Sequence, residues 1–121
     1  MTQTPTEPAP GSTPGITPGT SPENAGLVEN SGQVWLDGNL VPIGQANISV
    51  MDHGVLYGDG VFEGIRSYGG KVLKLQTHLK RFFESAKSIR MDLPYTIEEL
   101  TGAIRQTLEA NSRVDAYIRL A

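Results

Sequence analysis

Residues 52–66 read Asp-His-Gly-Val-Leu-Tyr-Gly-Asp-Gly-Val-Phe-Glu-Gly-Ile-Arg, with four glycines and two aromatic residues in fifteen positions. Glycine at this density weakens a packed strand, because it costs backbone entropy on folding and offers no side chain to pack. It suits a backbone that another group must approach closely. The stretch ends at Arg66, the first lysine or arginine of the chain. We therefore expect a ligand to lie near this backbone.

The sequence before this stretch predicts a β-hairpin. Val34–Leu36 and Leu40–Val41 are apolar runs on either side of Asp37-Gly38, a pair that readily adopts the positive φ of a tight turn. Ile48–Val50 is short and rich in β-branched residues, and we expect it to form a further strand.

The sequence after it predicts strands and helices in alternation. Residues 61–68 alternate as a strand, and Gly69-Gly70 turns the chain into a second strand over 71–75. A further strand is expected over 116–120, where the sequence stops in mid-pattern. From this ending we expect the chain to be a fragment of a longer protein.

Two amphipathic helices are predicted between these strands. Thr77 is expected to cap a helix that runs to about residue 89, and Thr96 with Glu99 forms a capping box for the second. The apolar stripe of the first helix consists of Leu79, Phe82, Phe83, Ala86 and Ile89. That of the second consists of Leu100, Ala103, Ile104 and Leu108.

Residues 33–121 are therefore expected to form one small α+β domain, with a small antiparallel sheet and two helices packed on it. Residues 1–32 hold six of the eight prolines and have no aromatic residue, lysine or arginine. Such a Pro/Thr/Gly-rich segment buries too little apolar surface to offset its ordering entropy, so we expect a disordered tail. No secretory signal, transit peptide, membrane span or cysteine is present, and the chain is expected to be a cytoplasmic protein without a membrane association.

The charges are divided unevenly along the chain. The seven acidic residues up to Glu63 are accompanied by no lysine or arginine, whereas all ten lysines and arginines lie from Arg66 onward, among six acids. A small anionic ligand would be drawn to the second half. Nucleic acid is not expected as a partner, because the bases alternate with acids and the net charge is −3.

Alternation along the predicted strands places candidate binding residues on shared faces. Phe62, Gly64, Arg66 and Tyr68 point to one side of their strand, a mixture of aromatic surface, gap and cation that suits a pocket wall. The alternative is that Phe62 and Tyr57 are core aromatics and Gly64 is a bulge. Tyr117 also shares a face with a guanidinium, that of Arg119, and the two are able to hold a carboxylate. The alternative there is an edge strand with a solvent-facing arginine.

Arg81 is the cation that best suits a phosphate. It is expected in the opening turn of the first helix, near free backbone amides. The alternative is an ordinary surface arginine paired with Glu84. His53 and His78 lie 25 residues apart without clustered carboxylates, so we expect structural hydrogen bonds from them and no metal site.

Four motifs in register resemble one family. They are Trp35-Leu36-Asp37-Gly38, the run from His53 to Arg66, His78-Leu79-Lys80-Arg81 with Ser85-Ala86-Lys87, and Ala116-Tyr117-Ile118-Arg119. From Val34 to Ala121 the chain resembles the N-terminal small domain of the fold type IV, or class IV, pyridoxal-phosphate-dependent aminotransferases, most closely the branched-chain amino acid aminotransferases. One departure is Leu120, where the family usually has proline.

The resemblance implies a role for each candidate residue. Arg81 would contact the phosphate of pyridoxal 5'-phosphate. Tyr57, Phe62 and Gly64 would line the pocket for the substrate side chain, and Tyr117 with Arg119 would help to bind the carboxylate of the acidic substrate.

The resemblance also implies a reaction, transamination between branched-chain L-amino acids and 2-oxoglutarate, with glutamate as the other product, in a homodimer. The lysine that carries the cofactor would lie in a C-terminal domain beyond residue 121, so the chain holds no catalytic residue and is expected to be inactive alone. The D-amino acid aminotransferases and aminodeoxychorismate lyases share the scaffold and remain alternatives, as does a non-catalytic ligand-binding module.

Overall fold

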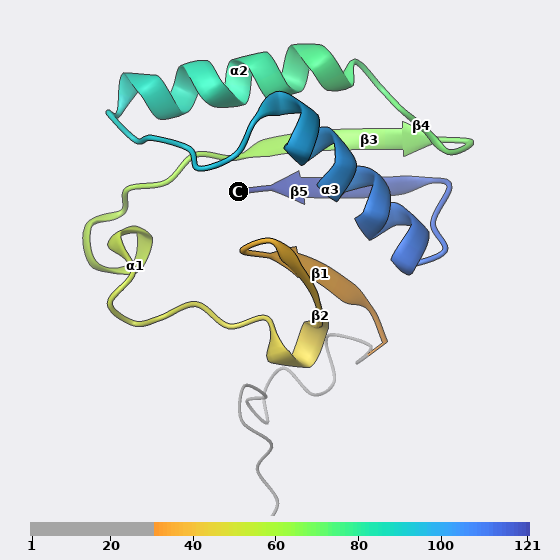
Figure 1. The fold of residues 1–121 in the computed structure, drawn as a ribbon, viewed down its shortest axis with the longest axis horizontal. Helices are drawn as coiled ribbons and strands as arrows, with labels where there is room; N and C mark the ends of the chain where they lie inside the picture. Colours follow the sequence, from red (N-terminus) through yellow and green to blue (C-terminus); the bar gives the residue numbers. More distant parts are fainter. Residues whose placement is uncertain (1–30) are drawn as a thin grey trace, which may run out of the picture.

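The computed structural model describes residues 31–121, so the predicted tail over 1–32 lies outside the described residues except for its last two positions. The described part has the expected α+β fold, with antiparallel strands and two long helices (Figure 1). Its elements in chain order are β1 Gln33–Leu36, β2 Asn39–Pro42, the 3₁₀ helix η1 Ile43–Gln45, α1 His53–Tyr57, β3 Glu63–Tyr68, β4 Lys71–Val72, α2 Leu75–Ser88, α3 Ile97–Ala110 and β5 Ala116–Leu120.

The predicted hairpin is confirmed as β1 and β2. Its two-residue turn consists of Asp37 at φ 48° and Gly38 at φ 93°, the positive values that a tight hairpin turn requires. Asn111, next to the end of α3, holds the first strand through both ends of its side-chain amide. Its Oδ1 accepts from the Gln33 backbone N–H at 2.8 Å, and its Nδ2 donates to the Gln33 carbonyl at 2.9 Å. The hairpin is thereby attached to α3.

The strand predicted over Ile48–Val50 is wrong. These residues form an irregular loop, and the side chains of Ile48 and Val50 are mostly exposed. The Asp52 backbone N–H donates to the Ser49 carbonyl at 3.0 Å, so the chain turns there instead of pairing with another strand.

Three strands form a second antiparallel sheet in the order β4-β3-β5. The strand predicted over 61–68 begins at Glu63, and the one predicted over 116–120 is confirmed. Gly69 and Gly70 make the predicted turn with positive φ. The strand predicted over 71–75 ends early, at Val72, because the backbone at Lys74 turns to φ 48° and the next residue already starts a helix.

The first long helix, α2, starts earlier than predicted. Thr77 is not its N-cap and lies within the first turn, while Lys74 occupies the cap position without a side-chain hydrogen bond. Leu79, Phe82 and Ala86 are buried as expected, but Ile89 lies just beyond the helix and is 45% exposed. The helix therefore buries a stripe one turn shorter than the sequence suggests.

The second long helix, α3, begins with the predicted capping box. The Thr96 Oγ1 accepts from the Glu99 backbone N–H at 3.1 Å, and the Glu99 carboxylate accepts from the Thr96 backbone N–H at 2.7 Å. Of the four residues predicted for its apolar face, the helix buries Leu100, Ala103 and Ile104. The fourth, Leu108, is partly buried and packs against the core.

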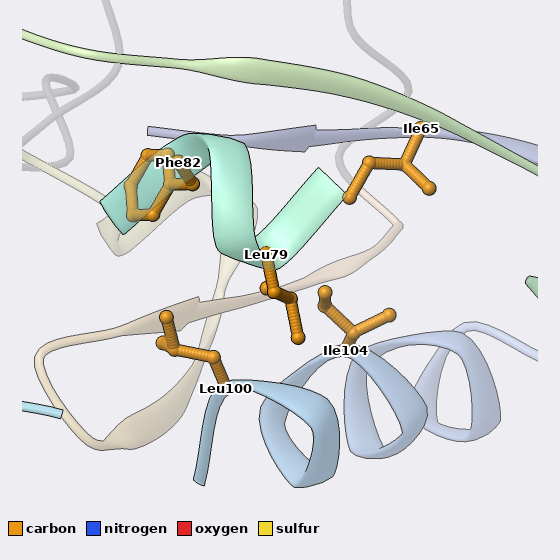
Figure 2. Close-up of a cluster of buried hydrophobic side chains, with 5 residues drawn as sticks. All are labelled: Ile65, Leu79, Phe82, Leu100 and Ile104. Carbon is orange, nitrogen blue, oxygen red and sulfur yellow. The ribbon is translucent and has the colours of Figure 1, made fainter. Parts of the chain in front are cut away.

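The core lies between α2, α3 and one face of the second sheet. Its buried residues are Ile65, Leu79, Phe82, Leu100 and Ile104 (Figure 2). The helix α2 packs on β3, and α3 packs on both α2 and β1. Within residues 31–121, no helix has the length and apolar content to cross a membrane. The sheet thus has one face against the helices, and the other carries the residues described next.

Candidate functional site

The two faces of β3 differ in every successive residue. Glu63, Ile65 and Ser67 are buried against the helices, whereas the residues between them are exposed. On β5, Tyr117 and Arg119 are exposed in the same way. The predicted face assignments are therefore confirmed. We call this exposed side the outward face, and its residues are Phe62, Gly64, Arg66, Tyr68, Tyr117 and Arg119.

A guanidinium and an aromatic ring meet on the outward face. Gly64 pairs with Arg119 across the two strands, which brings the Arg119 side chain beside the residues that flank Gly64. Its guanidinium carbon lies 3.9 Å from the centre of the Phe62 ring, within the range of a cation–π contact. The Phe62 side chain is 59% exposed, so it is not a core aromatic. The apolar surface and the cation thus form one continuous patch.

Gly64 provides the space that the Tyr117 side chain occupies. A Cβ added at Gly64 would lie 2.6 Å from the Tyr117 hydroxyl oxygen and 3.1 Å from the ring. Any side chain there would move the tyrosine. Gly64 lies within a regular strand and not in a bulge. The close approach expected of this glycine is thus made by a tyrosine of the same chain.

Arg66 also lies on the outward face, and the sequence indicates no separate role for it. It pairs with Tyr117 across the strands, and its Nε lies 3.4 Å from the Tyr68 hydroxyl. That hydrogen bond raises the pKa of Arg66 above its ordinary value. Arg66 lies two residues after Gly64, and this spacing already indicated that the two share a face. A second guanidinium on that face increases the attraction for an anion.

Arg81 lies on α2 and reaches a residue of the opposite face. Its Nε donates to one oxygen of the Glu63 carboxylate and its Nη2 to the other, both at 2.6 Å. His78 Nδ1 lies 2.7 Å from the second oxygen. The hydrogen bonds from Arg81 lower the pKa of Glu63 to about 2, against the opposing effect of burial, and those from His78 add to this. The carboxylate in turn raises the pKa of Arg81.

The surroundings of Arg81 differ from those expected. It lies in the second turn of α2, not in the opening turn with its free amides. Its partner is Glu63, eighteen residues away, and not Glu84. The expectation that His78 makes a structural hydrogen bond is confirmed. The Arg81 side chain as a whole remains 60% exposed, so it is accessible to a ligand.

Within residues 31–121, Tyr57 makes no side-chain hydrogen bond or ring contact with the outward face. It lies at the end of α1, is 70% exposed and packs edge-on against His53, with the ring centres 5.2 Å apart. The short helix itself was not predicted, although its signals were present: Asp52 accepts from the Gly54 N–H at 2.8 Å, and Gly58 ends it with φ 72°.

A hollow of about 910 Å³ lies elsewhere, between β4, the start of α2 and the end of α3, and no predicted site residue lines it. The structure therefore brings together Phe62, Gly64, Tyr117 and Arg119 on the outward face, whereas Glu63 holds Arg81 on the inward side of β3. They form an exposed surface and not an enclosed cavity. An aromatic ring, a hydroxyl and guanidinium groups on one surface suit a ligand that is both apolar and anionic.

Comparisons with known proteins identify a family. The family described as "Amino-transferase class IV" matches residues 60–121. A putative branched-chain-amino-acid aminotransferase of Methanocaldococcus jannaschii is 50% identical over 88 residues, which are 73% of this chain and 31% of that protein. A D-alanine aminotransferase of Staphylococcus haemolyticus is 39% identical over 80 residues, which are 66% of this chain and 28% of that protein.

A solved structure shows the same relationship. The branched-chain aminotransferase of the thermophilic archaeon Thermoproteus uzoniensis, solved with norvaline, is similar with a TM-score of 0.68 and 45% identity. The similarity covers 73% of this chain and 31% of that one. The chain thus spans about a third of the length of the relatives it matches.

The fold and the family match place the chain among the aminotransferases. It belongs to the class IV aminotransferase family, and the predicted resemblance is confirmed at that level.

Proposed function

We propose that the chain is part of an aminotransferase that exchanges amino groups between branched-chain L-amino acids and 2-oxoglutarate. The single observation that carries this is the Arg119 guanidinium stacked 3.9 Å over the Phe62 ring, on the same face as the Tyr117 hydroxyl that lies over Gly64. One surface then offers an apolar contact for a leucine side chain. It also offers charge-assisted hydrogen bonds for the second carboxylate of glutamate.

Pyridoxal 5'-phosphate is the proposed cofactor, and the described residues fit its phosphate at one position. Glu63 engages two of the Arg81 nitrogens, Nε and Nη2, and the Arg81 side chain is 60% exposed. It would hold the phosphate through its remaining N–H groups. When bound, the cofactor supplies the electron-withdrawing ring that allows the amino group to be transferred.

The parts of the reaction that these residues do not supply are assigned to a second domain. We propose that residues 33–121 form the small domain of a larger protein, as their share of the relatives' length suggests. The lysine that carries the cofactor would belong to that second domain, and the complete protein would be a homodimer, with Tyr57 completing the pocket for the substrate side chain.

The direct test is an assay of the complete protein with pyridoxal 5'-phosphate. We expect transamination between L-leucine and 2-oxoglutarate, measured as glutamate formed, and little with D-alanine. Activity with D-alanine alone would assign the chain to the D-amino acid branch, to which one of its relatives belongs. No transamination with any amino acid, or turnover by the 121-residue chain alone, would reject the proposal.

Replacement of Arg119 tests the dual substrate specificity. Arg119→Ala should slow the 2-oxoglutarate half-reaction by about tenfold more than the leucine half-reaction, because only the former needs the second carboxylate to be bound. The matched control is Arg105→Ala on the exposed side of α3, which should change neither. Equal losses in both half-reactions would remove the role assigned to Arg119.

A further inference from the structure

Among the described residues, Glu63 is the one charged residue that is buried, with 5% of its surface exposed. A carboxylate in such a place is costly unless it is paired and hydrogen-bonded. Both of its oxygens are used: one by Arg81 Nε, and the other by Arg81 Nη2 and His78 Nδ1. It keeps its charge at neutral pH, because these hydrogen bonds lower its pKa to about 2.

The contact fixes one edge of the Arg81 guanidinium. The carboxylate meets the edge formed by Nε and Nη2, with two parallel bonds of 2.6 Å. Nη1 and the second hydrogen of Nη2 lie on the other edge, which makes no hydrogen bond to a carboxylate within residues 31–121. A planar group that is held along one edge offers its remaining donors in a fixed direction.

His78 adds a second constraint. It lies one turn before Arg81 on α2, and its Nδ1 donates to the same Glu63 oxygen as the Arg81 Nη2 does, so it acts on Arg81 through the shared carboxylate. Through Glu63 both side chains are attached to β3, at a position between the outward-face residues Phe62 and Gly64. The direction of the guanidinium is thereby linked to the backbone of the candidate site.

We propose that Glu63 and His78 are positioning residues. They hold the Arg81 guanidinium so that its other edge, formed by Nη1 and the second hydrogen of Nη2, faces the cofactor phosphate. This rests on the proposed function. The negative charge of Glu63 by itself repels a phosphate. Glu63 can therefore favour phosphate binding only by orienting the Arg81 guanidinium. A long arginine side chain that is ordered in advance loses less conformational entropy when it binds.

The test uses the complete protein and measures the dissociation constant of pyridoxal 5'-phosphate. The Glu63 carboxylate accepts hydrogen bonds from two Arg81 N–H groups and the His78 ring. In Glu63→Gln only one oxygen can accept, and the amide NH₂ faces an N–H group of Arg81 or His78. The paired hydrogen bonds between residue 63 and Arg81 are therefore broken. We expect Arg81→Ala to weaken binding at least tenfold and Glu63→Gln at least fivefold. The double variant should bind no more weakly than Arg81→Ala alone, because Glu63 acts only through Arg81.

A second readout observes the arginine directly. In wild type the Arg81 Nε–H should give a resolved NMR resonance that exchanges slowly with water, and Glu63→Gln should bring it to fast exchange. If Glu63→Gln proves too unstable to study, Glu63→Asp replaces it. This variant keeps the charge on a shorter side chain, and both its cofactor affinity and its Arg81 Nε–H exchange rate should lie between those of wild type and those expected for Glu63→Gln. Glu84→Gln, an exposed position on the same helix, is the matched control and should change neither.

The outcomes separate the two proposals. Weaker binding in Arg81→Ala with unchanged or tighter binding in Glu63→Gln, or losses that add in the double variant, would overturn the positioning role and leave the phosphate role of Arg81 intact. Unchanged binding in Arg81→Ala would overturn both.

Discussion

The two faces of the β4-β3-β5 sheet carry different kinds of residues on the same strands. The inward face packs Ile65 against α2 and α3, with Leu79 fully buried beside it. On the outward face, Phe62 and Tyr117 are more than half exposed, and Arg119 is exposed as well. Strand alternation alone separates the side chains that stabilise the fold from those proposed to bind a ligand.

Glu63 is the exception among the residues of the inward face. It points inward, yet it is charged and carries the ion pair with Arg81. An apolar residue in its place would leave Arg81 without both of its hydrogen bonds to the carboxylate. That the chain uses a charged residue here is consistent with a role in orienting Arg81.

The largest expected effect is on the inward face. Leu79→Ala removes a fully buried side chain and should lower the free energy of unfolding by about 3 kcal/mol. This is a large part of the stability of a small domain. Phe62→Ala, on the outward face and 59% exposed, should cost less than about 1 kcal/mol. Urea unfolding followed by circular dichroism measures both, and similar losses would mean that the two faces are not distinct.

A smaller effect is expected for the space at Gly64. In Gly64→Ala the new methyl would lie 2.6 Å from the Tyr117 hydroxyl, so the exposed ring must move outward. A displacement near 1 Å in a binding site lowers kcat/KM on the order of 100-fold. The control is Gly60→Ala, where a Cβ meets no atom within 4 Å. If the complete protein kept its kcat/KM for leucine in Gly64→Ala, Tyr117 would not be part of the substrate site.

The last effect appears only in acid and concerns the stability that the Glu63 carboxylate contributes to the fold. The pKa of Glu63 is about 2 in the folded chain and 4.5 by ordinary value, so between these pH values the unfolded chain binds a proton that the folded one does not. The stability contributed by this carboxylate is fully present above pH 4.5 and is lost as the pH falls toward 2.

Glu63→Gln should therefore show a flatter decline of the free energy of unfolding over this range than wild type. Glu84→Gln should decline like wild type, since it keeps Glu63. Identical curves for Glu63→Gln and wild type, from urea unfolding between about pH 2 and pH 6, would show that the ion pair with Arg81 does not perturb this carboxyl.

Local signals were sufficient for much of the fold. The Asp37-Gly38 turn and the capping box of Thr96 and Glu99 each depend on residues close in sequence, so their patterns predicted them. The alternation around Gly64 predicted which side chains share a face.

Features that depend on distant residues were not predicted. The ion pair between Glu63 and Arg81 joins a strand to a helix, and no spacing in the sequence indicates it. The strand predicted over Ile48–Val50 lacks a partner strand, which propensity alone does not supply. The start of α2 depends on the turn at Lys74, a residue that rarely has positive φ.

The most direct measurement is a crystal structure of the complete protein with N-(5'-phosphopyridoxyl)-L-glutamate. We predict its phosphate within hydrogen-bond distance of the Arg81 guanidinium, and its side-chain carboxylate within that distance of Arg119 or the Tyr117 hydroxyl. A ligand bound away from β3 and β5, with the outward face covered by other parts of the protein, would contradict the account.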